Sequence, residues 1–123
     1  MKGAVVGLFR HPVKGFTPEP IAHAVLEAGR HFPCDRLYAV ENGPSGFDPS
    51  APVHISKMRF TVLAKIPKVA AIRTRFEPET HVFHAEMTGQ TPFAGALSDE
   101  GGRDGLAAWL TDALAGELDG PLK

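Results

Sequence analysis

Prolines divide this chain into short segments. Eleven of its 123 residues are proline, and three of them, at positions 12, 18 and 20, fall together with Gly15 in the stretch from Arg10 to Pro20. Proline fixes φ and has no backbone donor, so neither a helix nor a strand ladder is expected to run through this stretch. The sequence therefore predicts a long loop over residues 10–20 with short elements on both sides.

Apolar, β-branched runs predict strands before and after this loop. Residues 4–9 form the first run, residues 21–26 the second and residues 37–40 the third. Residues 43–52 are rich in Gly, Pro, Ser and Asp, which is typical of a surface loop. Apolar patterning resumes directly after this loop, so we expect no domain boundary there.

The second half of the chain predicts a short helix, a hairpin and a longer helix. Residues 56–65 predict the short helix, with Ser56 as its N-cap and Pro67 ending it. Residues 69–76 and 81–87 flank a proline-containing turn and predict a hairpin. Five apolar residues with the spacing i, i+3, i+4, i+7 and i+8 predict the longer helix, namely Leu106, Trp109, Leu110, Ala113 and Leu114.

Composition limits the class of protein. Apolar residues make up 43% and charged residues 22% of the chain, as in folded globular proteins, and residues 1–123 are enough for a single domain with its own core. The net charge of -1 provides no general attraction to nucleic acid or to an anionic membrane. The apolar run that stops before Arg10 is too short for a signal-peptide core or a membrane span.

Cysteine and histidine give little support for a metal or catalytic centre. Cys34 is the single cysteine, which excludes an internal disulfide and a site with several thiolates, so we expect a reducing compartment and a cytoplasmic protein. His81 and His84 are three positions apart on a predicted strand and should point to opposite faces, so a shared metal ion is not expected. We predict no metal site and no catalytic residue in this chain.

Two short cationic motifs lie in predicted loops next to strand ends. They are His11-Pro12-Val13-Lys14-Gly15 and Cys34-Asp35-Arg36. Pro12 restricts the backbone and Gly15 permits a turn, so Lys14 should project from a constrained loop. The guanidinium of Arg36 can bind phosphate bidentately. The residues alone leave a second interpretation open, in which the lysine is merely solvated and the arginine pairs with a carboxylate to fix a corner.

In the order and spacing of these motifs the sequence resembles MOSC (molybdenum cofactor sulfurase C-terminal) proteins, in the N-terminal β-barrel region that precedes the molybdenum-site half of two-part members. Residues 8–15 are similar to the family's aromatic-Pro-Val-Lys-Ser/Gly signature. Asp35-Arg36 follows at a family-like interval. Farther along, Lys57, Phe60, Leu63 and residues 67–70 are similar to the family's next short helix and strand.

The resemblance implies a mainly β, α+β fold, in which an antiparallel, barrel-like sheet carries a short internal helix and a C-terminal helix. It also implies binding of the molybdenum cofactor (molybdopterin), with Lys14, Gly15 and Arg36 holding its phosphate, so we expect Lys14 and Arg36 to lie close together. The implied partner is a MOSC C-terminal half or a redox protein, within an oxidoreductase or sulfur-carrier system. We expect no turnover from this chain alone.

The sequence departs from the family at three positions. The family's metal-ligating cysteine belongs to the later half, so Cys34, which stands where relatives commonly have glycine, is not assigned as a ligand. His11 replaces an aromatic residue, and Gly15 replaces the serine of some relatives and offers only a backbone donor. The alternative function is a noncatalytic interaction domain that has lost the cofactor. Whether the natural protein continues past Lys123 stays open.

Overall fold

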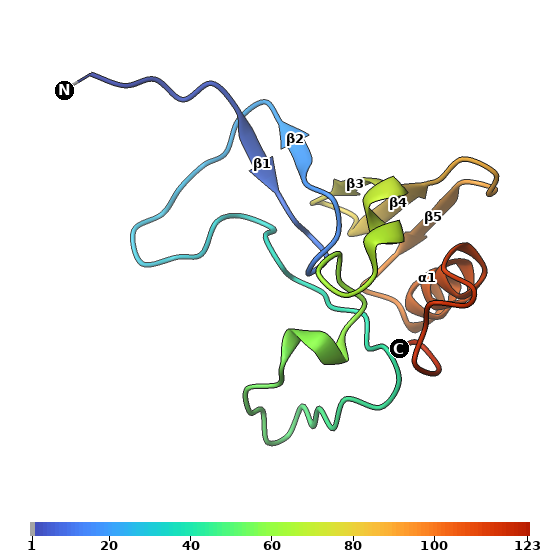
Figure 1. The fold of residues 1–123 in the computed structure, drawn as a ribbon. Helices are drawn as coiled ribbons and strands as arrows, with labels where there is room; N and C mark the ends of the chain where they lie inside the picture. The colour runs from blue at the N-terminus through green and yellow to red at the C-terminus, as the bar shows by residue number, and fades with distance from the viewer. Residues whose placement is uncertain (1) are drawn as a thin grey trace.

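The strands form two antiparallel sheets in the computed structural model, which describes residues 2–123. The first sheet pairs β1 (Leu8–Arg10) with β2 (Glu19–Ile21), and the second has the order β3 (Arg73–Glu77), β4 (Val82–Glu86), β5 (Phe93–Ala96). Figure 1 shows the β1–β2 ribbon next to the β3 edge of the larger sheet. The predicted antiparallel, mainly β fold is confirmed, whereas the described strands form two sheets and not one closed ladder.

Strand pairing passes through Pro20, so the prediction of an unbroken loop over residues 10–20 was wrong. Pro20 lies opposite Phe9, and Arg10 lies opposite Glu19. Both strands of a two-stranded ribbon are edge strands, where a proline without a backbone donor is tolerated.

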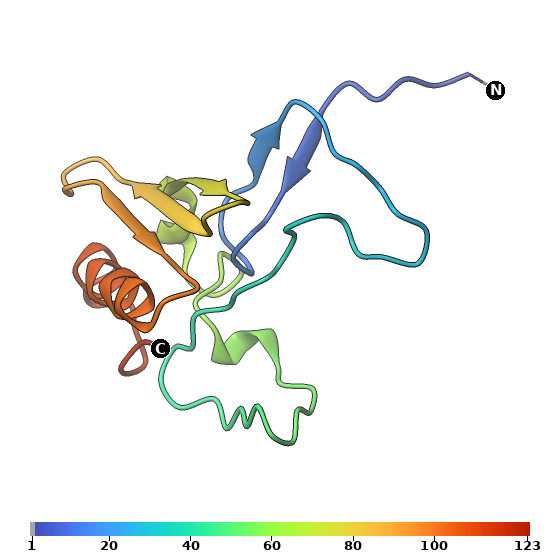
Figure 2. The same cartoon turned by 180° about the vertical axis from the view of Figure 1, so that it is seen from behind.

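The apolar segments beyond this ribbon do not continue as strands, contrary to the predictions for residues 4–9 and 21–26. The ribbon ends at the pair Leu8 and Ile21, and the two segments then separate, as both views of the fold show (Figures 1 and 2). Val6 is fully exposed and Val25 is 76% exposed. An apolar pattern predicts a strand only where a partner and a core are present, and these segments have neither.

The predicted strand over residues 37–40 is also absent. Tyr38 instead makes an isolated parallel bridge with Val13, and Val40 is buried. This segment is extended, but it lacks the neighbours that would make it part of a sheet.

The predicted helix over residues 56–65 is reduced to one 3-10 turn, η1 (Lys57–Arg59). Ser56 does cap it, because its hydroxyl accepts a hydrogen bond from the Met58 backbone N–H at 3.3 Å. A second 3-10 helix, η2 (Pro67–Ala71), follows. Pro67 therefore begins a helix, at the first position, where its fixed φ and missing donor are tolerated.

The predicted hairpin and C-terminal helix are both present. β3 and β4 pair from Arg73 opposite Glu86 to Glu77 opposite Val82. Helix α1 (Glu100–Ala113) packs on the larger sheet through Leu106 and Leu110, which are 4% and 0% exposed. Strand β5 was not predicted, since its sequence Phe-Ala-Gly-Ala shows no alternation of apolar and polar residues. No helix among residues 2–123 is long and apolar enough to cross a membrane.

The ribbon and the larger sheet share no ladder of backbone hydrogen bonds among residues 2–123. Side chains connect them instead. Arg10 Nε donates to Glu19 Oε2 at 2.9 Å, and Arg10 Nη2 donates to the Phe76 carbonyl at 2.8 Å. The Phe76 N–H in turn donates to Glu19 Oε1 at 3.1 Å. The side chains of Arg10 and Glu19 are only 11% and 8% exposed. We call this closed set of contacts the Arg10–Glu19 seam.

Candidate functional site

The two cationic motifs, distant in sequence, lie side by side. The Lys14 N–H donates to the Tyr38 carbonyl at 2.8 Å, and the Tyr38 N–H donates to the Pro12 carbonyl at 3.1 Å. The Arg36 N–H donates to the His11 carbonyl at 2.5 Å. Backbone hydrogen bonds therefore place Lys14 and Arg36 on neighbouring segments.

Asp35 connects the two motifs through its carboxylate. One oxygen accepts a hydrogen bond from the His11 N–H at 2.7 Å, and the other pairs with the Arg36 guanidinium. Cys34 and Arg36 have positive φ values of 56° and 52°, a conformation that is uncommon for residues other than glycine. The Arg36 side chain is nevertheless 58% exposed, so it pairs with a carboxylate and still reaches solvent.

A groove of about 620 Å³ contains both predicted side chains. Lys14, Arg36 and Lys123 contribute cations to its lining, and Phe47 and Phe60 contribute aromatic rings. Glu41 also lines the groove, and its carboxylate accepts a hydrogen bond from the Ser45 hydroxyl at 2.5 Å. The Asp35 carboxylate compensates Arg36, and the remaining two lysines outnumber the one side-chain carboxylate of the lining, so the groove favours an anion.

The Lys14 ammonium rests on an aromatic ring. Its Nζ lies 4.9 Å from the centroid of Phe60, within the range of a cation–π interaction. No carboxylate forms an ion pair with Lys14 in the part of the chain that the structure describes.

The comparisons with known proteins identify the family. A model of the MOSC N-terminal beta barrel domain matches residues 2–117. The chain belongs to this family. No curated protein and no solved structure matches it. Membership confirms the resemblance carried by the Lys14 and Arg36 motifs and identifies the chain as a MOSC N-terminal domain.

Gly15 of this MOSC N-terminal domain has a packing role. Its φ is 75°, and an added Cβ would lie 2.3 Å from Val62 Cγ1. Its carbonyl accepts a hydrogen bond from the Leu63 N–H at 2.9 Å. These contacts seat the Lys14 loop on residues 60–63, and the proposed phosphate contact of Gly15 stays a prediction.

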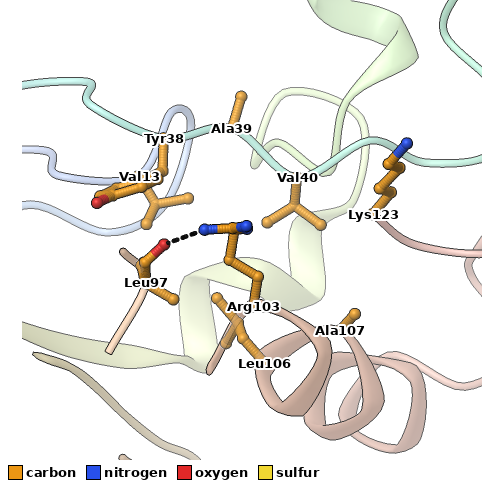
Figure 3. A pocket seen from close by; sticks show the side chains of 9 residues that line it. All are labelled: Val13, Tyr38, Ala39, Val40, Leu97, Arg103, Leu106, Ala107 and Lys123. Atoms are coloured by element: carbon orange, nitrogen blue, oxygen red, sulfur yellow. Dashed lines mark hydrogen bonds between the residues drawn. The ribbon is translucent and has the colours of Figure 1, made fainter. Parts of the chain in front are cut away.

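A small apolar cavity of about 40 Å³ lies between residues 38–40 and α1 (Figure 3). Tyr38, Ala39 and Lys123 line both this cavity and the groove. Arg103 of α1 extends into the cavity, where its Nη1 donates to the Leu97 carbonyl at 2.9 Å. The extended segment 38–40 is thus the wall that the groove and the cavity share.

Tyr38 connects this wall to the hairpin. Its hydroxyl lies 2.5 Å from His81 Nδ1. Burial raises the pKa of the Tyr38 phenol, the Arg103 cation acts to lower it, and Cys34 acts to raise it. His81 has a φ of 58° and lies just before β4 and not on it.

The two histidines considered as a metal pair contact different groups. His84 Nε2 lies 2.9 Å from a Glu77 carboxylate oxygen, whereas His81 contacts Tyr38. This hydrogen bond from His84 lowers the pKa of the Glu77 carboxyl. Within residues 2–123, no cluster of three or more His, Cys, Asp or Glu side chains is arranged to hold a metal ion.

Sequence reasoning did not assign Phe47, Phe60 or Lys123 to the site. The sequence predicts Phe60 within a helix, whereas the residue lies just after η1 and bridges to Glu41. Nothing in the sequence between Asp35 and Phe60 indicates that these segments meet, so no local pattern would have found them.

Proposed function

We propose that this domain binds the phosphate of a molybdopterin-type cofactor in the groove lined by Lys14 and Arg36. The observation that carries the proposal is the backbone bridge between Val13 and Tyr38, which sets the two cationic motifs next to each other. An ammonium is a compact point charge, whereas a guanidinium offers a planar fork of donors. A phosphate can accept from both at once.

The groove suits a phosphorylated small molecule. Its volume of about 620 Å³ falls within the range of about 300–1,000 Å³ that is usual for such sites. Lys14, Arg36 and Lys123 supply positive charge, while Phe47 and Phe60 supply apolar surface for the rest of the ligand.

In this proposal the domain binds the phosphate and a partner protein supplies the metal ligand. When bound, the cofactor supplies the metal-centred chemistry, and a MOSC C-terminal half supplies the metal ligand. Lys14 and Arg36 neutralise and orient the phosphate, which requires no nucleophile or general base from this chain.

A second candidate function is a noncatalytic interaction domain. The observation that favours it is the exposure of four apolar side chains next to the β1–β2 ribbon. Val5, Val6, Val25 and Leu26 are 78%, 100%, 76% and 71% exposed. Each of the two segments exposes a pair of adjacent apolar residues, and a partner protein that covers them would remove this apolar surface from water.

Titration with pyrophosphate, followed by amide chemical shifts, distinguishes the two candidates. Binding in the groove should shift the amides of Lys14 and Arg36 together with one dissociation constant. The affinity should fall as salt rises, because exposed charges are screened over about 8 Å at physiological ionic strength. Shifts scattered over the surface without saturation would contradict cofactor binding and favour the interaction domain.

Substitutions test which cations of the groove bind the phosphate. Lys14→Ala should weaken pyrophosphate binding with little change in stability, and Arg36→Ala should weaken binding and also loosen the Asp35 corner. Lys68→Ala is the matched control, because Lys68 is an exposed lysine on η2 outside the groove. Equal affinity in Lys14→Ala, Lys68→Ala and the unmodified protein would contradict the assignment.

A further inference from the structure

The two groove cations assigned to the phosphate differ in how much of their charge is already compensated. Arg36 is paired with the Asp35 carboxylate, whereas Lys14 has no carboxylate partner among residues 2–123 and contacts the Phe60 ring. An aromatic face attracts a cation through its quadrupole and leaves the net charge unchanged. Lys14 is therefore held in place without losing its attraction for an anion.

Phe60 is itself held from several directions. Its N–H donates to the Lys57 carbonyl at 3.1 Å, and Phe60 makes an antiparallel bridge with Glu41. The next residue, Thr61, donates its N–H to the Val40 carbonyl at 2.7 Å. These bonds fix the backbone of Phe60 against residues 40–41, on the wall of the groove.

Residues 60–63 also hold the backbone of the Lys14 loop. The Leu63 N–H donates to the Gly15 carbonyl, and Gly15 packs on Val62. One segment thus positions the loop at its backbone through Val62 and Leu63, and positions the side chain of Lys14 through Phe60.

We propose that Phe60 is a positioning residue for anion binding, which holds the Lys14 ammonium at the groove while leaving its charge available to a phosphate. This inference rests on the proposed function of the groove. The ring covers one side of the ammonium, so the N–H groups on the other side remain available to a ligand. A lysine without this support loses more rotamer freedom when it binds.

The test compares Phe60→Leu and Phe60→Tyr in pyrophosphate titrations. Phe60→Leu removes the ring and should weaken binding roughly two- to five-fold, the factor that corresponds to a cation–π contact at an exposed site. Phe60→Tyr keeps the ring and should bind like the unmodified protein. Phe9→Leu is the matched control, because Phe9 is a 57% exposed phenylalanine that lies outside the groove.

A spectroscopic signal reports the contact independently of affinity. The ε-methylene group of Lys14 is bonded to the Nζ atom that lies over the Phe60 ring. Its protons should therefore show an upfield ring-current shift that Phe60→Tyr retains and Phe60→Leu loses. If Phe60→Leu loses this shift and binds pyrophosphate as tightly as the unmodified protein, the positioning role is wrong and the phosphate site stands. If the unmodified protein does not bind pyrophosphate at Lys14 and Arg36, the proposed function fails, and the positioning role fails with it.

Discussion

Gly15 and Val62 are in such close contact that any side chain on Gly15 would overlap Val62. An added Cβ would lie 2.3 Å from Val62 Cγ1 and 2.9 Å from Val62 Cα. The glycine also has a φ of 75°, a backbone conformation that is unfavourable for residues with a side chain. The loop that carries Lys14 can therefore rest on residues 60–63 only because it has no side chain at this point.

Gly15→Ala should lower the free energy of unfolding more than the φ angle alone explains. Gly29→Ala is the control, because Gly29 has the same φ of 75° and no heavy atom within 4 Å of an added Cβ. We expect about 1–2 kcal/mol for the backbone conformation in both variants and a further cost of about 1–3 kcal/mol for the overlap in Gly15→Ala. Urea unfolding measures both, and equal losses would show that Val62 moves aside.

Glu19→Ala should destabilise the protein by about 3–5 kcal/mol, because it leaves the largely covered Arg10 guanidinium without its carboxylate. It also removes the acceptor of the Phe76 N–H. Glu79→Ala, an exposed glutamate in the turn between β3 and β4, is the control and should change stability by less than about 0.5 kcal/mol. Similar unfolding midpoints for the two variants would contradict the role of the Arg10–Glu19 seam.

Alanine should have opposite effects at two adjacent glycines of α1. A Cβ at Gly102 would lie 1.8 Å from the Ala96 carbonyl oxygen, whereas one at Gly101 meets nothing within 4 Å. We expect Gly101→Ala to stabilise the protein by about 0.5 kcal/mol through helix propensity, and Gly102→Ala to destabilise it by about 1–3 kcal/mol. Thermal unfolding gives the sign, and stabilisation by Gly102→Ala would mean that α1 does not approach β5 this closely.

The phenol of Tyr38 should ionise above its ordinary pKa of about 10, because burial raises it. Tyr38 is the only tyrosine, so the near-ultraviolet absorbance of tyrosinate reports this group alone. Because the pKa is raised in the folded state, the contribution of the neutral phenol to folding stability is complete below the pKa of the unfolded chain. This contribution is lost as the pH rises through the pKa of the folded protein. Tyr38→Phe should flatten this decrease in stability at alkaline pH. An absorbance titration with the same midpoint in the folded protein and in urea would contradict the prediction.

The sequence predicted best those elements whose residue pattern lies entirely within a short stretch of the chain. The spacing of Leu106, Trp109 and Leu110 and the proline turn before His81 are complete within short windows, and both elements are present. The predicted strands over residues 4–9 and 21–26 are absent before Leu8 and after Ile21. Strand length depends on a pairing partner, and the apolar pattern does not contain this information. Pro20 was misjudged for the same reason, since its position on an edge becomes known only once the sheet is known.

The candidate site was predictable in part. Lys14 and Arg36 were identified from their motifs, and the structure places both on one groove. Phe60 and Lys123 reach that groove through contacts between segments far apart in the chain, for which the sequence contains no local signal. The cation–π contact of Lys14 with Phe60 is an example, since it joins two residues that lie far apart in the chain.

A ladder of backbone hydrogen bonds can form from almost any residues, because every residue except proline carries the same donor and acceptor. The connection between the two sheets lacks this generality, because the side chains of Arg10 and Glu19 occupy the place of a ladder. A substitution at either position would remove this seam while leaving each strand with the residues it needs, and among residues 2–123 only the hydrogen bonds of Thr17 with Ile72 and Thr74 would remain beside it. The connection between the sheets in this domain therefore depends on the identity of a few side chains, whereas the pairing within each sheet does not.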